Sequence, residues 1–264
     1  MFKDLKESLL TKLFLIIMIL WIILALIFGF TDLQISIAVV DETSNWGNFG
    51  AVYGEPPGYA LIAIALATFL GGFFKELHYQ KIPAYISVVV GIFFIVFSND
   101  FTDVMTGLGL IIPILIYVLF TWKKDWSNYR VLSGIISLLA IIHPLLFVQL
   151  TKVFWGRVRF RDLTVPGYIE YTPWFILQGI NGNQSFPSGH TAMGWMFLPL
   201  LIPLRKKEWK NPIRIIGTIV LIGWGIFVGL SRIAIGAHYA SDVLFSTGIP
   251  ILITYLLYQK YYID

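Results

Sequence analysis

The stretch TKLFLIIMILWIILALIFGF, residues 11–30, decides the fold class of this chain. Lys12 is its one charged residue, and a helix of about 20 apolar residues is long enough to cross the hydrocarbon core of a bilayer. The stretch is longer than the core of a secretory signal peptide and lacks a small-residue cleavage pattern. We therefore predict a membrane-spanning helix that is retained.

Seven further apolar runs follow the first along the chain. Of the 264 residues, 57% are apolar and 13% are charged, whereas a soluble domain carries about a quarter charged residues. This composition excludes a cytosolic enzyme, and the absence of cysteine excludes disulfides, thiolate metal sites and a cysteine nucleophile. We predict a single all-α domain over residues 1–264, a polytopic bundle of about eight membrane-spanning helices at roughly 11–30, 58–74, 82–98, 104–121, 131–150, 189–204, 213–231 and 241–258.

The distribution of positive charge predicts the orientation. With eight crossings, 14 of the 19 basic residues fall on the side of the two termini, and 5 fall on the other side. Loops that stay in the cytoplasm are enriched in lysine and arginine. We therefore expect a multi-pass protein of the cytoplasmic membrane with both termini in the cytoplasm. The five basic residues expected outside are Lys152, Arg157, Arg159, Arg161 and Arg232.

These outer cations belong to a small group of polar motifs within residues 151–242. The motifs are KVFWGRVRFR at 152–161, FPSGH at 186–190 and SRIAIGAHYASD at 231–242. Interfacial cations can simply anchor lipid headgroups. Anchoring does not explain why histidine, aspartate and a Pro-Ser-Gly turn gather at the same membrane depth.

The spacing of the motifs favours a phosphate site. Pro187 is suited to the start of a helix, where free N–H groups at Ser188 and Gly189 could receive an oxyanion and place His190 beside it. His238 and Asp242 are four residues apart, so on a helix they share a face, and the carboxylate could orient the imidazole.

The same residues suit phosphoryl transfer chemically. Lys152, Arg159 and Arg232 are the expected phosphate ligands, and two histidines can supply a nucleophile and a proton donor. The sequence offers no cluster of acidic residues outside for a metal pair. We expect a site that uses neither a metal nor another cofactor.

The three motifs resemble those of the type 2 phosphatidic acid phosphatase family, which includes the lipid phosphate phosphatases. The family pattern is Lys-x6-Arg-Pro, then Pro-Ser-Gly-His, then Ser-Arg-x5-His-x3-Asp. Here these motifs begin at Lys152, Pro187 and Ser231, in the same order and with the same internal spacing. Phe160 replaces the proline of the first motif, which leaves the phosphate ligands in place but changes the local loop. Eight spans also exceed the six of the simplest members, so the resemblance implies a six-helix phosphatase core.

The resemblance also implies roles for individual residues. His238 would be the nucleophile that forms a phosphohistidine, Asp242 would orient it, and His190 would protonate the leaving oxygen. The sequence leaves open whether Arg157 and Arg161 contact a second phosphate or a neighbouring lipid. The implied phosphate-binding residues are Lys152, Arg159, Ser188, Gly189 and Arg232.

The function expected from these observations is hydrolysis of a terminal phosphate from a membrane lipid, on the extracytoplasmic face. A lipid phosphate monoester and a polyprenyl diphosphate remain alternative substrates. Two other functions stay open, a phospholipid transporter or flippase that binds headgroups at the outer cations, and a lipid phosphotransferase. The expected partners are the lipid phosphate and the bilayer, with no nucleic acid, and the oligomeric state is left open.

Overall fold

The computed structural model describes residues 2–263, and the regular secondary structure within that range is entirely helical. Helices form because the apolar runs are long and because backbone polar groups in lipid must be satisfied within the segment. In chain order the elements are α1 (Phe2–Val39), α2 (Asn45–Tyr53), α3 (Pro56–Gly71), η1 (Tyr79–Lys81), α4 (Ile82–Val96), α5 (Phe101–Thr121), η2 (Trp126–Tyr129), α6 (Arg130–Ala140), the π-helix η3 (Ile141–Val148), α7 (Gln149–Trp155), η4 (Phe160–Asp162), α8 (Gly189–Gly194), η5 (Trp195–Leu200), α9 (Leu201–Arg205), α10 (Pro212–Ala234), α11 (Ala240–Tyr258) and the π-helix η6 (Gln259–Ile263).

Six helical segments within the described residues have the length and hydropathy of membrane spans. The prediction of a polytopic helical membrane bundle is confirmed, and six of the predicted spans meet this measure of length and hydropathy. The runs predicted at 58–74 and 189–204 are helical but short, since α3 has 16 residues and the second run is divided among α8, η5 and α9. The six spans are Leu9–Val39, Tyr79–Val96, Phe101–Thr121, Trp126–Asp162, Pro212–Ala234 and Ala240–Ile263.

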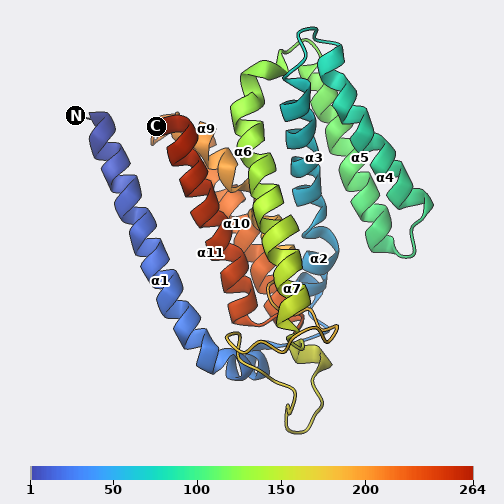
Figure 1. The fold of residues 1–264 in the computed structure, drawn as a ribbon, viewed down its shortest axis with the longest axis vertical. Helices are drawn as coiled ribbons and strands as arrows, with labels where there is room; N and C mark the ends of the chain where they lie inside the picture. Colours follow the sequence, from blue (N-terminus) through green and yellow to red (C-terminus); the bar gives the residue numbers. More distant parts are fainter. Residues whose placement is uncertain (1, 264) are drawn as a thin grey trace.

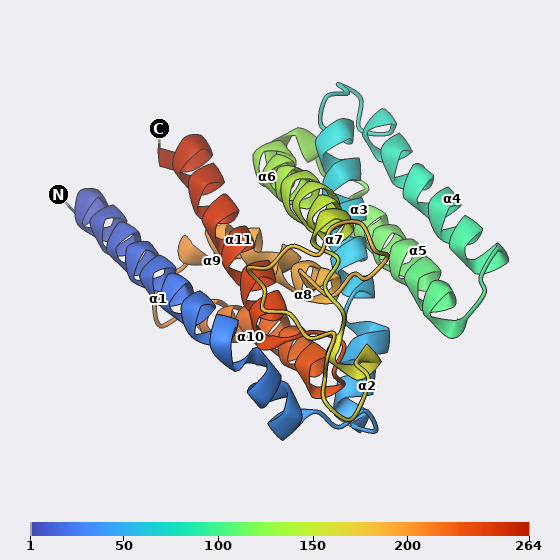
Figure 2. The same ribbon diagram turned by 60° about the horizontal axis from the view of Figure 1, so that its bottom comes forward.

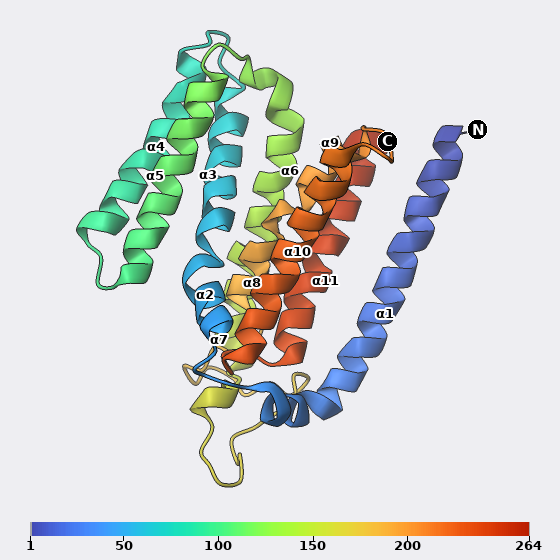
Figure 3. The ribbon, with the colours of Figure 1, turned by 180° about the vertical axis from the view of Figure 1, so that it is seen from behind.

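The two ends of the chain lie at the same end of the bundle. Figure 1 shows α1 and α11 running side by side toward that end, with the long connection between α7 and α8 at the opposite end. The connections from α3 to α4 and from α5 to α6 lie on the side of the termini as well (Figures 1 and 3). The predicted charge segregation therefore corresponds to two physical ends of the molecule.

Two groups of buried side chains hold the bundle together. One lies where α3, α6 and the α8–η5 segment meet and includes Leu139 and Met196, both fully buried. The other lies among α3, α4, α5 and η2 and is centred on the buried Trp126. The α4–α5 hairpin lies on the side of the bundle away from α1 (Figure 3).

Helix α1 packs against α11 and reaches the end of the bundle that carries the motifs. Phe14 stacks on Tyr255 with ring centroids 3.8 Å apart, and Trp21 Nε1–H donates to the Leu244 carbonyl at 3.0 Å. The last turns of α1 lie close to the turn between α10 and α11 (Figure 2). This arrangement brings residues of α1 to the three motifs.

Gly156 ends α7 and turns the chain into the long connection. Its φ is +61°, and a Cβ there would lie 2.2 Å from the carbonyl oxygen of Gly179, so glycine is required. The connection then folds back across the ends of α10 and α11 before α8 begins (Figure 2). The first motif thus comes to lie beside the other two.

Candidate active site

His238 lies in the turn between α10 and α11 and is almost completely buried. Its Nδ1 is 2.6 Å from the carbonyl oxygen of Ser185. A carbonyl can only accept, so Nδ1 carries the hydrogen and Nε2 carries the lone pair. Burial lowers the pKa of His238 to about 3, against an ordinary value of 6.5, so the ring is neutral at pH 7.

Asp242 lies four residues further, in the first turn of α11, whereas His238 precedes the helix, so the two residues do not share a helical face as the spacing predicted. Its Oδ2 is 3.5 Å from His238 Nδ1 and accepts hydrogen bonds from the Ser185 hydroxyl at 2.6 Å and from the Tyr239 N–H at 3.0 Å. The nearest acceptor of the imidazole is therefore the Ser185 carbonyl. Asp242 holds Ser185 in place through the hydrogen bond from the Ser185 hydroxyl, and its carboxylate also faces Nδ1 of His238.

Arg157 forms the other contact of Asp242, and the structure resolves the question that the sequence left open. Its Nη1 is 2.6 Å from Asp242 Oδ1, and its Nη2 is 2.8 Å from Asp32 Oδ2. Asp32, on α1, also accepts from the Ser241 N–H at 2.9 Å. All these side chains are completely buried, so Arg157 contacts neither a second phosphate nor a lipid. Arg161, by contrast, is about one-third exposed.

Lys152, Arg159 and Arg232 lie close enough to one another for their charges to interact. Lys152 interacts electrostatically with both arginines, and the charges of Lys152 and Arg232 act on the His238 ring. Among the described residues, Arg159 Nε and Arg232 Nε and Nη1 are buried without a hydrogen-bond acceptor in the protein. Buried guanidinium N–H groups are costly to leave unpaired. Their donors suit an anionic ligand with several oxygens.

The Pro-Ser-Gly-His motif begins α8 as predicted, but Ser188 is used differently. Its N–H donates to the Asp242 carbonyl at 3.2 Å, so the expectation of a free N–H at this residue is wrong. The Ser188 hydroxyl oxygen caps α8 by accepting from the N–H and the hydroxyl of Thr191 at 3.3 and 2.8 Å. Gly189 faces the cations instead, since a Cβ there would lie 3.4 Å from Lys152 Nζ.

His190 is bonded through both of its ring nitrogens. Nδ1 is 2.8 Å from Glu55 Oε1, and Nε2 is 3.1 Å from the carbonyl oxygen of Ala51. Glu55 lies in the connection between α2 and α3, and its Oε2 accepts from the Tyr59 hydroxyl at 3.3 Å. Sequence reasoning missed Glu55, because an acidic residue before Pro56 in a connection carries no signal of its own.

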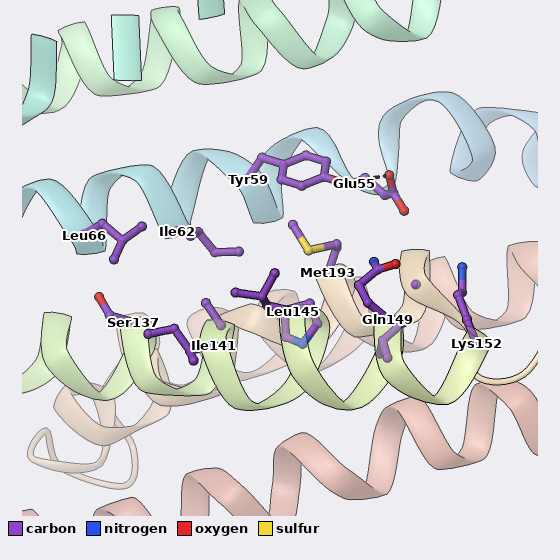
Figure 4. Close-up of a pocket in the computed structure, with 14 residues that line it drawn as sticks. Glu55, Tyr59, Ile62, Leu66, Ser137, Ile141, Leu145, Gln149, Lys152 and Met193 are labelled. Carbon is purple, nitrogen blue, oxygen red and sulfur yellow. Dashed lines mark hydrogen bonds between the residues drawn. The ribbon is translucent and has the colours of Figure 1, made fainter. Parts of the chain in front are cut away.

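A cavity of about 340 Å³ opens from this site between α3 and the α6–α7 segment. Glu55 and Lys152 line one end, and apolar side chains such as Ile62, Leu66 and Leu145 line the rest (Figure 4). Gly189 also lines the cavity, beside Lys152. Along α3 the cavity extends from Glu55 to Leu66, about 16 Å at the helical rise of 1.5 Å per residue. It is therefore polar at the end that contains Glu55 and Lys152 and suited to a hydrocarbon chain beyond it.

Phe160, the residue in the place of the motif proline, anchors the loop by aromatic contacts. Its ring stacks on Tyr168 with centroids 5.6 Å apart and meets Tyr239 edge to face at 6.4 Å. Gly236 lies directly against it, since a Cβ there would be 3.2 Å from the Phe160 ring. Aromatic packing thus supports the loop that carries Arg159 and Arg161.

Comparison with known proteins gives one family model that matches this part of the chain. The model of the PAP2 superfamily matches residues 133–263, which contain all three motifs. No solved structure matches the chain significantly.

Similar curated proteins are found in bacteria and mammals. Phosphatidylglycerophosphatase B of Bacillus subtilis is 25% identical over 171 residues, which are 59% of this chain and 72% of that protein. Phospholipid phosphatase 1 of Rattus norvegicus is 32% identical over 37% of this chain and 36% of its own length. Lipid A 1-phosphatase of Rhizobium etli is 29% identical over 46% of this chain and 47% of its own length. The matches thus span less than half of the rat and Rhizobium proteins.

Proposed function

Residues 133–263 of this chain belong to the PAP2 superfamily, and we propose on that premise that the protein is a membrane lipid phosphatase acting through a phosphohistidine. The observation that carries the proposal is the set of buried guanidinium N–H groups of Arg159 and Arg232 that have no acceptor in the protein. The two arginines interact electrostatically with each other, and the charge of Arg232 acts on His238. A phosphoryl group bound there would pair these donors and place its phosphorus before the nucleophile.

The nucleophile in this proposal is Nε2 of His238. The Ser185 carbonyl holds the hydrogen on Nδ1, and burial keeps the ring neutral, so Nε2 has a free lone pair at physiological pH. Attack on phosphorus leaves a positive charge on the imidazole, which the Asp242 carboxylate, 3.5 Å from Nδ1, would stabilise.

Three cations would stabilise the transition state. Phosphoryl transfer spreads charge over three equatorial oxygens, and fixed donors in a dehydrated site stabilise such charge strongly. Lys152, Arg159 and Arg232 are positioned for this role. No group of three histidine or acidic side chains suited to a metal ion occurs within the described residues, and we propose that the cations of the protein replace metal ions here.

His190 is the proposed acid for the leaving oxygen. It lies on the first turn of α8, next to Gly189 and at the end of the cavity. After His190 protonates the alcohol and that product departs, the now neutral ring would accept a proton from the water that hydrolyses the phosphohistidine.

The cavity supports a lipid substrate that lies parallel to the helices. Its apolar walls along α3 and α6 would receive one hydrocarbon chain, with the phosphate at Lys152 (Figure 4). In our proposed topology the chain crosses the membrane eight times, counting α3 and the α8–α9 segment, with the termini in the cytoplasm and the site on the extracytoplasmic face. The segregation of the basic residues to the end that carries the termini supports this orientation.

Phosphate release by the purified protein tests the proposed function. The substrates are phosphatidate, phosphatidylglycerol phosphate and a polyprenyl diphosphate, each assayed with and without EDTA. We expect release from at least one of them, unchanged by EDTA, and inhibition by vanadate, which mimics the trigonal-bipyramidal transition state.

The matched control for this assay is His238→Gln, which should release no phosphate. Activity that EDTA abolishes and Mg²⁺ restores would contradict the metal-independent mechanism. Headgroup binding without any hydrolysis would favour a transporter, and transfer of phosphate to an added alcohol in place of water would favour a phosphotransferase.

A further inference from the structure

Glu55 is the acidic residue nearest to His190, and it lies outside both the three motifs and the matched region 133–263. Its Oε1 is 2.8 Å from His190 Nδ1. The two side chains come from different parts of the chain, the α2–α3 connection and the start of α8, and both are about three-quarters buried. The tertiary structure therefore brings Glu55 and His190 into contact.

The partners of His190 define its protonation state in this arrangement. Nδ1 faces a carboxylate and Nε2 faces the Ala51 carbonyl, and both of these groups are acceptors. Each ring nitrogen must then carry a hydrogen, which makes the ring an imidazolium. His190 and Glu55 thus form a charged pair in a site that is mostly shielded from water.

The neighbouring charges keep Glu55 ionised. Burial would raise the pKa of its carboxyl, but the hydrogen bond from His190 and the charges of His190, Arg232 and Lys152 outweigh burial and lower it. The other groups that face Glu55 are the neutral Tyr59 hydroxyl and the Ala51 carbonyl on the far side of the His190 ring.

We propose that Glu55 is the positioning residue of the acid: it holds His190 by Nδ1–H and keeps the ring cationic until Nε2–H is given to the leaving oxygen. This inference rests on the proposed function. Of the two acceptors, the Ala51 carbonyl is uncharged and therefore the weaker, so its bond to Nε2–H is the one that the leaving oxygen would replace.

The proton balance of the step is complete. The bond from phosphorus to the lipid oxygen breaks as the bond from His238 Nε2 to phosphorus forms. The lipid oxygen takes the hydrogen of His190 Nε2, which leaves His190 neutral with Nδ1–H still bonded to Glu55. Water then attacks the phosphohistidine and returns a proton to His190 Nε2, and phosphate leaves. Glu55 stays ionised throughout, as the aspartate of a serine-hydrolase triad does.

The position of Glu55 in the cavity supports this role. Glu55 and Lys152 line the polar end of the cavity (Figure 4), and Gly189 lines the cavity beside Lys152. The bond between the phosphate and the lipid oxygen would lie at this end. The nucleophile has its own carboxylate, Asp242, and its own carbonyl, that of Ser185. Each histidine therefore has a separate pair of acceptors, one carboxylate and one carbonyl.

The test compares Glu55→Gln with the wild-type protein on two substrates that differ in the leaving group. An alkyl leaving group, as in phosphatidate, needs a proton, whereas a nitrophenolate does not. Loss of general acid catalysis costs about 10²–10⁴-fold, so we expect Glu55→Gln to lose at least about tenfold in kcat/KM on the lipid, a constant that covers the steps up to departure of the leaving group. The kcat/KM for p-nitrophenyl phosphate should change by less than about threefold, because its leaving group requires no proton.

Three variants complete the design. Glu42→Gln, an exposed acidic residue ahead of α2, should behave as wild type on both substrates. Glu55→Asp keeps the charge and should recover part of the lipid activity. The double variant Glu55→Gln/His190→Ala should be no slower on the lipid than His190→Ala alone, because Glu55 acts through His190.

The possible outcomes separate this inference from the proposed function. Equal losses on both substrates, or no loss on either, would overturn the role of Glu55, and so would additive losses in the double variant. If Glu55→Gln is recovered unfolded, Glu55→Asp compared with His190→Ala still decides, since a purely structural Glu55 would slow both substrates equally. A wild-type protein that releases phosphate from no substrate would instead refute the proposed function.

Discussion

Arg157 and Asp242 form an ion pair that is completely shielded from water, with Nη1 2.6 Å from Oδ1 and neither side chain exposed. Arg157 also binds Asp32 on α1, which lies 125 residues away in the sequence. Its guanidinium lies over the Tyr239 ring at 3.9 Å from the centroid. The helix at the beginning of the chain is therefore joined to the carboxylate that faces the proposed nucleophile.

Replacing Arg157 should destabilise the protein strongly. Arg157→Met would leave two buried carboxylates without the cation that neutralises them, and breaking a buried pair in this way costs about 3–5 kcal/mol. We expect a large fall in the thermal unfolding midpoint in detergent, together with loss of phosphatase activity. Arg161→Met, at a partly exposed residue of the same loop, is the matched control, and its thermal unfolding midpoint should be close to that of the wild type. Wild-type stability of Arg157→Met would show that the pair contributes little.

The two histidines should differ in phosphoenzyme trapping. His238→Ala should form no phosphoenzyme with any substrate, because the attacking nitrogen is removed. His190→Ala should lose about 10²–10⁴-fold in turnover of a lipid phosphate but retain most of its activity on an aryl phosphate. Rapid-quench trapping of acid-labile, base-stable phosphohistidine measures both effects. Phosphoenzyme in His238→Ala and none in His190→Ala would mean that the roles are reversed.

The buried His238 should make stability depend on pH in a definite direction. Its pKa is about 3 in the folded protein and near 6.5 in the unfolded chain, so below pH 6.5 the unfolded chain binds the additional proton. The contribution of His238 is complete above pH 6.5 and declines as the pH falls toward 3, by up to about 1.4 kcal/mol per pH unit.

Unfolding midpoints at pH 7, 6 and 5 in detergent test this dependence. Wild type should lose stability more steeply than His238→Gln, which cannot titrate at this position. Parallel curves for the two proteins would show that His238 has the same pKa in the folded and unfolded states.

The orientation of the chain can be tested with single cysteines, because the protein has none of its own. Ile169, 83% exposed in the long connection, and Trp209, 77% exposed at the opposite end, are suitable positions. Ile169→Cys should react with a membrane-impermeant thiol reagent in intact cells, and Trp209→Cys only after lysis. The reverse pattern would place the active site in the cytoplasm.

The sequence by itself determined the helical membrane bundle and the three motifs, because both depend on local patterns. Apolar runs such as 11–30 fix a helix whatever surrounds them, since backbone polar groups in lipid have no other partners. The four-residue spacing of His238 and Asp242 likewise keeps the two side chains close, although His238 lies in the turn before α11. The two short runs, by contrast, fall below the length of the other spans, and hydropathy alone does not show that α3 has 16 residues or that the second run is divided among α8, η5 and α9.

Only the tertiary structure decided which groups complete the site. Glu55 and Asp32 are unremarkable acidic residues in the sequence, and they acquire partners because α1 and the α2–α3 connection pack against the motifs. The group that sets the tautomer of His238 is the backbone carbonyl of Ser185, and because every residue has such a carbonyl, the sequence cannot indicate which one has this role. These contacts join residues that lie at least 53 positions apart in the sequence, and a charge or a carbonyl acquires its role there only when burial removes competing water.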